Sequence, residues 1–204
     1  FQAAGKTIMW VAINQHVVGM IALADTLRPE AAAAMTALTK IGVANTIMLT
    51  GDNANSAAAI SKEVGISDFR AELMPEDKLN VIRDLVKKYQ AVAMIGDGVN
   101  DAPALANSTV GIAMGGAGTD VALETADVVL MGDDLSRLSF AVGLGRATRS
   151  IIVQNLVISM GVIALLIVAS LTGFMSIGPA VVFHEGSTII VVLNALRLLQ
   201  FNQS

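Results

Sequence analysis

Several residues in the first half of the chain have the side chains that bind a metal ion and a phosphoryl group. Asp97 and Asp101 lie four residues apart in a turn that leads into a helix, so their carboxylates can converge on one hard cation such as Mg²⁺. Lys78 offers a point positive charge, and the Thr50 hydroxyl and the Gly51 amide can donate hydrogen bonds to phosphoryl oxygens. Together these residues predict phosphoryl-transfer chemistry.

The elements expected to position these residues are the strands and helices of a parallel α/β sheet. Apolar strands are expected at 46–49 and 91–95, and Thr50-Gly51-Asp52 and Asp97 directly follow them. Because ligands bind at the carboxyl ends of parallel strands, both turns are expected at one edge of the sheet. Helices are also expected at 29–41, 55–64, 75–89, after Asp101 and near 120–125, and strands at 69–71, 110–113 and 128–131. The alternative for each residue taken alone is a structural role. Thr50-Gly51-Asp52 and Asp97-Gly98 are then ordinary turns, and Lys78 is a solvated lysine on a helix.

Charge divides the chain into two parts. Residues 1–150 carry 12 Lys and Arg and 16 Asp and Glu, whereas residues 151–204 carry only Glu185 and Arg197. Two apolar stretches, 151–172 and 177–199, are each long enough to cross a bilayer as a helix, so a transmembrane hairpin is expected. The arginines at its outer ends predict that residues 1–150 and the C-terminus are cytoplasmic. We further expect the protein to be integral to the cell (plasma) membrane.

Composition excludes several classes of function. A formal net charge of −4 with 4% aromatic residues argues against a nucleic-acid surface. The count of 0 cysteines excludes a disulfide framework, a thiolate metal site and a cysteine nucleophile in this chain. Because the chain opens at Phe1 without a signal-peptide pattern, we expect it to be the interior of a longer polypeptide.

Three motifs together resemble those of one protein family. Thr50-Gly51-Asp52, Pro75-Glu76-Asp77-Lys78 and the eight residues from Gly96 to Pro103 are similar to the later motifs of the haloacid-dehalogenase-like phosphorylation domain of P-type ATPases. The segment from Ala24 to Glu30 resembles the hinge, including Asp25, by which such chains re-enter that domain. The resemblance covers essentially the whole chain and is strongest for the heavy-metal-translocating subfamily.

The resemblance implies a fold and a domain order. The fold is an α/β haloacid-dehalogenase-like, Rossmann-like parallel sheet followed by a two-helix transmembrane hairpin. Residues 1–23 would be the last hairpin of the nucleotide-binding domain with its hinge. Residues 24–134 would be the phosphorylation domain, and residues 135–204 the membrane segment.

The resemblance also assigns roles to residues. Asp97 and Asp101 would position Mg²⁺, Lys78 would neutralise an acyl phosphate formed from ATP, and Thr50 and Gly51 would hold its oxygens. Asp52, in the same motif, is a further catalytic candidate. Asn100 would add a polar contact to the phosphate. The Asp-Lys-Thr-Gly-Thr motif that carries the family's nucleophile does not occur here. The expected partners are therefore the rest of the polypeptide, namely its nucleotide-binding and actuator domains and upstream membrane helices, together with membrane lipid.

The second apolar stretch contains the residues expected to bind the transported ion. Ionisable groups at bilayer depth are costly, so His184 and Glu185 indicate a functional site. Imidazole and carboxylate ligands suit Zn²⁺, Co²⁺ or Cd²⁺ better than Cu⁺, and His184-Glu185-Gly186 resembles a motif of the cobalt/zinc-type branch. The alternative is that both side chains are structural polar groups that pair with each other or with another helix.

The sequence therefore predicts a P-type ATPase that exports a divalent transition metal ion through an aspartyl-phosphate intermediate. The alternatives are a soluble phosphatase of the same fold, a non-catalytic membrane metal-binding remnant, and a pump of the same family for Cu⁺ or K⁺. The hairpin disfavours the phosphatase, and an upstream nucleophile motif would distinguish a pump from a remnant.

Overall fold

The computed structural model describes residues 6–23, 27–97, 100–115, 124–132 and 134–201. The chain divides into two compact units, Phe1–Ser139 and Phe140–Ser204. The helices and strands that lie within the described residues are β1 (Thr7–Ile13), β2 (His16–Leu23), α1 (Ala31–Lys40), β3 (Ile47–Leu49), α2 (Ala54–Val64), β4 (Asp68–Arg70), α3 (Pro75–Tyr89), β5 (Ala93–Gly96), α4 (Ala102–Asn107), β6 (Val110–Gly115), β7 (Val128–Met131), α6 (Ser136–Leu171), α7 (Ile177–Leu196) and the 3₁₀ helix η2 (Arg197–Gln200).

The first two strands form an antiparallel hairpin, which the polar residues Asn14, Gln15 and His16 between two apolar runs predict. The turn is made by Asn14 and Gln15, whose φ angles of 48° and 64° are positive, as the two central residues of a tight hairpin turn require. Most of the large apolar side chains of both strands are exposed, including Trp10 at 68%. The hairpin therefore buries little apolar surface within the described residues, which is typical of two strands taken from a larger sheet.

The remaining strands are parallel, as predicted, but they form two sheets. β3 pairs with β4, and β5 pairs with β6, which in turn pairs with β7. No pairing joins β3 to β5 in the described part of the chain. Each of these two strands therefore has one edge whose backbone groups take no strand partner there.

Local sequence signals account for the helix boundaries near the polar turns. Asn53 caps α2 by accepting a hydrogen bond from the Ser56 amide at 3.0 Å, and Gly65 ends the helix with a φ of 80°. α3 begins at Pro75, and Asp77 accepts a bond from the Met74 amide at 3.0 Å. The helix expected near 120–125 falls largely on residues 116–123, outside the described residues.

The core of the first unit joins α3, β5 and α4. Ile82, Met94, Ala104 and Leu105 are buried together, and Leu49 of β3 packs against this cluster. A Cβ atom added at Gly111 in β6 would lie 2.8 Å from the Leu105 carbonyl oxygen, so only glycine allows α4 to approach β6 this closely. The two separate sheets thus adjoin one shared core.

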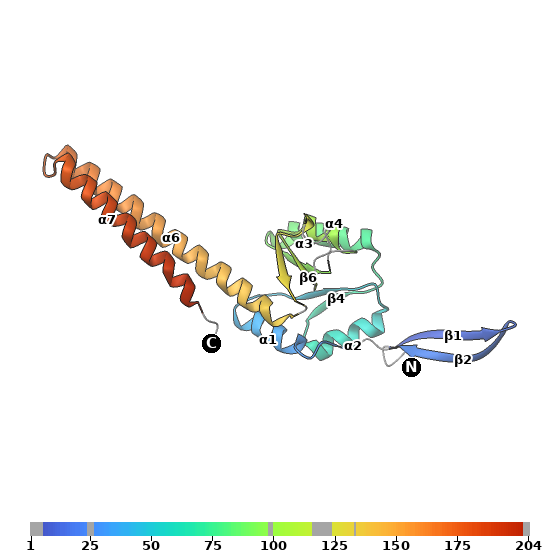
Figure 1. The fold of residues 1–204 in the computed structure, drawn as a ribbon. Coiled ribbons are helices and arrows are strands. Elements are labelled where there is room, and N and C mark those ends of the chain that lie inside the picture. Colours follow the sequence, from blue (N-terminus) through green and yellow to red (C-terminus); the bar gives the residue numbers. More distant parts are fainter. Residues whose placement is uncertain (1–5, 24–26, 98–99, 116–123, 133, 202–204) are drawn as a thin grey trace. The chain divides into compact units, whose positions relative to one another are not determined.

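The second unit is a helical hairpin (Figure 1). α6 runs unbroken through 36 residues, so the first expected span, 151–172, is the second part of a longer helix that already begins at Ser136. Both α6 and the segment Ile177–Gln200 are long and apolar enough to cross a membrane, and few of their residues are buried.

Near the start of α6, hydrogen bonds from the Ser136 hydroxyl and amide lower the pKa of the Asp134 carboxyl below its ordinary value.

Replacing Gly111 by Ala is expected to lower the free energy of unfolding by about 1–3 kcal/mol, because the new methyl group would force α4 away from β6. Thermal unfolding of the detergent-solubilised chain, followed by circular dichroism, measures this change. The control is Gly19→Ala, since a Cβ atom there meets nothing within 4 Å. Equal melting temperatures for the two variants would contradict the assignment.

Candidate active site

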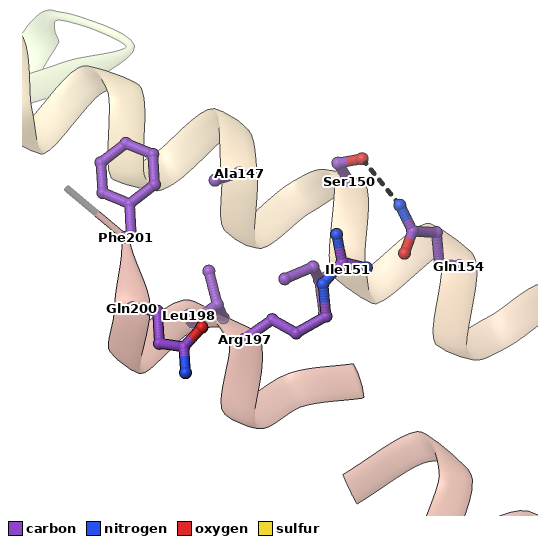
Figure 2. A pocket seen from close by; sticks show the side chains of 8 residues that line it. All are labelled: Ala147, Ser150, Ile151, Gln154, Arg197, Leu198, Gln200 and Phe201. Carbon is purple, nitrogen blue, oxygen red and sulfur yellow. Dashed lines mark hydrogen bonds between the residues drawn. The ribbon is translucent and has the colours of Figure 1, made fainter. Parts of the chain in front are cut away.

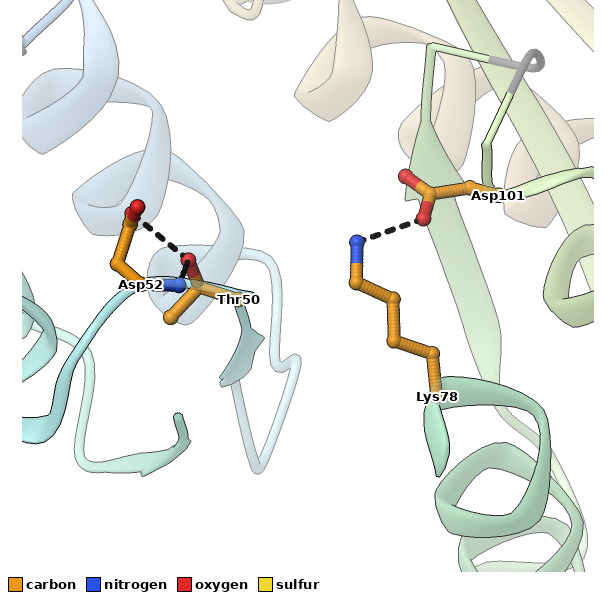
Figure 3. Close-up of polar contacts among 4 residues, drawn as sticks. All are labelled: Thr50, Asp52, Lys78 and Asp101. Atoms are coloured by element: carbon orange, nitrogen blue, oxygen red, sulfur yellow. Dashed lines mark hydrogen bonds and ion pairs between the residues drawn. The ribbon is translucent and has the colours of Figure 1, made fainter. Parts of the chain in front are cut away.

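An ion pair between Lys78 and Asp101 is the centre of the candidate site. The Lys78 Nζ atom lies 2.8 Å from the Asp101 Oδ1 atom, and the two side chains are only 18% and 14% exposed (Figure 3). Lys78 projects from the first turn of α3, and Asp101 immediately precedes α4. The pair therefore connects two helices that also share the core of the unit.

Gly96 makes room for this ion pair. It is the last residue of β5, and a Cβ atom added there would lie 2.7 Å from the Asp101 Oδ2 atom and 2.8 Å from the Asp101 Cβ atom. Such distances lie well inside van der Waals contact, so any side chain at this position would displace Asp101. Glycine therefore allows the carboxylate to fold back over the end of the strand.

A second polar cluster follows β3. The Thr50 hydroxyl donates to the Asp52 Oδ2 atom at 2.8 Å and accepts from the Asp52 amide at 3.1 Å (Figure 3). Backbone bonds tie this turn to the segment after β4: the Glu72 amide donates to the Asp52 carbonyl, and the Leu73 amide donates to the Thr50 carbonyl. Asp52 thus orients the hydroxyl that the sequence assigns to phosphoryl oxygens.

The two clusters occupy equivalent places in the fold. Thr50 and Asp52 follow the carboxyl end of β3, and Asp101 follows that of β5, where Lys78 reaches it from α3. Leu49, the residue before Thr50, packs against the core that contains Met94 of β5. The predicted placement of both turns at strand ends is therefore confirmed, while the pairing of Lys78 with Asp101 is a contact that no sequence signal indicated.

The other predicted site residues are less well defined. Asp97 and Asn100 are both exposed and flank residues 98 and 99, which the structure does not describe. The predicted hinge residue Asp25 also lies outside the described residues. Gly51 is exposed between Thr50 and Asp52.

The donor atoms present are compatible with a magnesium ion. Mg²⁺ in phosphoryl-transfer sites is held by one or two carboxylates, with substrate phosphates and waters completing the octahedron. Asp97 presents an exposed carboxylate at the end of β5, which fits this pattern. Asp101 has one oxygen engaged by Lys78. Among the described residues no group of three or more His, Cys, Asp or Glu side chains gathers into an all-protein metal site.

The candidate transport residues lie side by side on α7. His184 and Glu185 are both exposed, and within the described chain no hydrogen bond or ion pair joins them to each other. The Ser187 hydroxyl donates to the His184 carbonyl at 2.6 Å, and Ser187 is buried. The alternative that His184 and Glu185 pair with each other therefore finds no support in the described part of α7.

A polar cluster between the two membrane helices was only weakly indicated by the sequence. The Asn194 side-chain amide donates to Asn155 at 2.9 Å and to Gln154 at 3.2 Å, both on α6. It also accepts a bond from Arg197 at 2.9 Å. The signal that could have identified the cluster was the pair of adjacent amide residues, Gln154 and Asn155, inside an otherwise apolar span.

Comparison with known proteins identifies the chain's relatives. Residues 1–109 match the family model described as haloacid dehalogenase-like hydrolase. The chain is 50% identical over 199 residues to a cadmium-transporting ATPase of Staphylococcus aureus. The alignment covers 98% of this chain and 27% of that protein. It is also 50% identical over 197 residues to a zinc-transporting ATPase of Bacillus subtilis, with 97% of this chain and 31% of that protein aligned.

Solved structures give a concordant result. A crystal structure of a zinc-transporting PIB-type ATPase in the E2.Pi state superposes with a TM-score of 0.85 at 45% identity, over 97% of this chain and 32% of that one. These similarities confirm the resemblance to heavy-metal P-type ATPases that the motifs indicated. The chain spans 27% to 32% of the length of these three proteins.

A double-mutant cycle on Lys78→Met and Asp101→Asn is expected to give a coupling energy of about 1–2 kcal/mol, because the pair is mostly shielded from water. Thermal unfolding of the four variants provides the measurement. The matched control is the pair Lys87 and Asp84 on α3, whose side chains are both 77% exposed, and its coupling should stay below about 0.5 kcal/mol. Indistinguishable coupling energies would show that the pair between α3 and Asp101 contributes no more than a surface contact.

Proposed function

The chain belongs to the haloacid dehalogenase-like hydrolase family, and from this premise we propose that it forms the phosphorylation unit and two membrane helices of a pump. The pump uses ATP to export a divalent transition metal ion of the Zn²⁺, Co²⁺ or Cd²⁺ type. The observation that carries the proposal is the placement of two polar clusters, Lys78 with Asp101 and Thr50 with Asp52, after two parallel strands that adjoin one core.

We infer that the strand carrying the nucleophile enters between the two halves of the split sheet. β3 lacks a partner on the edge away from β4, and β5 lacks one on the edge away from β6, within the described chain. A parallel strand from an upstream part of the polypeptide would pair with both edges at about 4.8 Å on each side. Its carboxyl end would then lie between the two polar clusters, and an aspartate there would be the phosphorylated residue.

Lys78 and Thr50 would hold the phosphoryl group on that aspartate. The Lys78 ammonium is kept in place by Asp101 at 2.8 Å, so its charge is already positioned when the phosphoryl group arrives. The Thr50 hydroxyl donates to Asp52, and rotation of the O–H group about the Cβ–Oγ1 bond would redirect its proton to a phosphoryl oxygen. Both groups would favour the acyl phosphate by offsetting its negative charge.

Asp97, and in part Asp101, would hold Mg²⁺. When bound, Mg²⁺ neutralises charge on the phosphate oxygens of ATP during transfer. Asp97 is the exposed carboxylate at the end of β5, and Asn100 would supply an amide contact to the same phosphate.

His184 and Glu185 would bind the transported ion. An exposed imidazole and carboxylate in the middle of an apolar helix require partners, since unpaired ionisable groups are costly in hydrocarbon. A divalent ion held jointly with ligands from upstream helices would satisfy both groups. The relatives named for cadmium and zinc transport favour a borderline ion of this kind.

The remaining assignments follow from the same proposal. Residues 1–23 would complete the nucleotide-binding domain, residues 24–134 would be the phosphorylation domain, and residues 135–204 would be the membrane segment. Asp25 would act at the hinge. The protein would lie in the plasma membrane, with residues 1–150 and the C-terminus in the cytoplasm, as the arginine distribution favours.

Replacing Asp97 by Asn in the complete polypeptide is expected to reduce phosphoenzyme formation from ATP below detection, because the exposed carboxylate that would hold Mg²⁺ is lost. Acid-stable incorporation of labelled phosphate, with each divalent ion added in turn, measures it. Asp84→Asn, an equal change of charge on the exposed face of α3, is the control and should retain wild-type labelling.

The same assay separates the rival functions. Absence of a phosphoenzyme from the folded wild-type polypeptide under every metal would favour a membrane metal-binding remnant over a pump. Stimulation by Cu⁺ alone would support a pump of the same family that transports Cu⁺ in place of a divalent ion.

His184→Ala and Glu185→Gln are each expected to abolish the stimulation of ATP hydrolysis by Zn²⁺ or Cd²⁺, since each removes a proposed ligand of the ion. The control is His16→Ala, which removes the other of the chain's 2 histidines, on β2. Metal titration of hydrolysis in reconstituted vesicles is the measurement. An unchanged titration curve for both α7 variants would refute the ligand assignment.

A further inference from the structure

A pocket of about 410 Å³ lies between α6 and η2, the 3₁₀ helix that follows α7 (Figure 2). This volume is within the range of small-molecule sites. Its lining is half polar and half apolar. The polar residues are Ser150, Gln154, Arg197 and Gln200, and the apolar residues are Ala147, Ile151, Leu198 and Phe201.

Arg197 is the only charged residue that lines the pocket, and its guanidinium is held in place on one side. Its Nη1 atom donates to the Asn194 Oδ1 atom at 2.9 Å, and Asn194 is itself bonded to Asn155 and Gln154 on α6. Gln154 also donates to the Ser150 hydroxyl at 3.3 Å (Figure 2). This chain of amides connects both helices and orients the arginine.

The arginine has no carboxylate partner among the described residues. A guanidinium has five N–H donors, and the bond to Asn194 uses only one of the nitrogens. The only acidic residue between 140 and 204 is Glu185, twelve residues earlier, which corresponds to roughly 18 Å along a helix. The remaining donors are therefore available to an anion in the pocket.

The other positive charges near the pocket also favour an anionic ligand. Arg146 directly precedes the stretch of α6 that lines the pocket and Arg149 lies within that stretch without lining the pocket, so the positive charges of the second unit gather at one end of the hairpin. Arginines at the end of a membrane helix lie at the lipid headgroup level, and the cytoplasmic leaflet is rich in anionic lipids.

We propose that this pocket binds the phosphate headgroup of an anionic phospholipid from the cytoplasmic leaflet. The phosphate accepts hydrogen bonds from Arg197, while Ser150 and Gln200 contact the polar headgroup. Ile151, Leu198 and Phe201 contact the apolar part of the lipid next to it. The proposal rests on the part of the proposed function that inserts this hairpin in a membrane, and it is independent of phosphorylation.

Native mass spectrometry of the complete, delipidated polypeptide in detergent provides the test. Dioleoyl phosphatidylglycerol and dioleoyl phosphatidylcholine are titrated separately. The wild type is expected to retain the anionic lipid preferentially, and Arg197→Gln to weaken that binding about fivefold, the factor that one arginine contributes near an anionic surface. Arg149→Gln is the matched control, since it removes the same charge from the same end of the hairpin but does not line the pocket.

A second variant tests the cavity itself. Ala147→Phe should fill the pocket and abolish the preference without any change in charge. Equal preference in wild type and Arg197→Gln would overturn the proposal. Equal losses in Arg197→Gln and Arg149→Gln would overturn it too, because general surface charge would then account for binding. Displacement of the lipid by millimolar inorganic phosphate would identify a free-anion site instead.

The phosphoenzyme assay is run on the same samples. If labelling fails in the wild type while the lipid preference depends on Arg197, the pump is disproved and the lipid site stands. If labelling succeeds in every variant and no lipid preference exists, the lipid site alone is disproved.

Discussion

The candidate site depends on one partly buried ion pair. Lys78 and Asp101 are separated by 22 intervening residues, yet their contact joins α3 to the loop that follows β5. The pair can form only because Gly96 has no side chain to occupy the space taken by the carboxylate. A partly buried lysine without a counter-charge would be unfavourable, so the aspartate both stabilises the first unit and keeps the ammonium directed at the end of the sheet.

Much of the fold was predictable because its signals are local. The signals that define these elements each act within a few residues. They are the uninterrupted apolar strands, Asn53 and Gly65 at the ends of α2, and Pro75 at the start of α3. The predicted elements therefore match the observed ones closely. The ion pair was not predictable, since it depends on a close approach between residues distant in sequence. The separation of β3 from β5 was not predictable either, because strand neighbours are set by long-range packing and not by the pattern within a strand.

The second unit contains polar groups in two different situations. At one end, the Asn194 amide nitrogen donates to Gln154 and Asn155 and its oxygen accepts from Arg197, which fastens α7 to α6. Nearer the middle of α7, His184 and Glu185 remain exposed, and the Ser187 and Thr188 hydroxyls donate to the His184 carbonyl. A helix pair that is locked at one end and chemically open in its middle can receive a ligand without losing its own register.

The edges of β3 and β5 that take no strand partner within the described residues also bear on the handling of this segment in isolation. An exposed strand edge presents a row of backbone donors and acceptors that another chain can extend, and the two strands carry Ile47, Met48, Leu49, Met94 and Ile95 along those edges. Such short apolar strands have neither proline nor charge to discourage intermolecular pairing. A strand that belongs between them would therefore protect the protein from self-association as well as complete its sheet, and the segment expressed without one would carry two aggregation-prone edges into the cell.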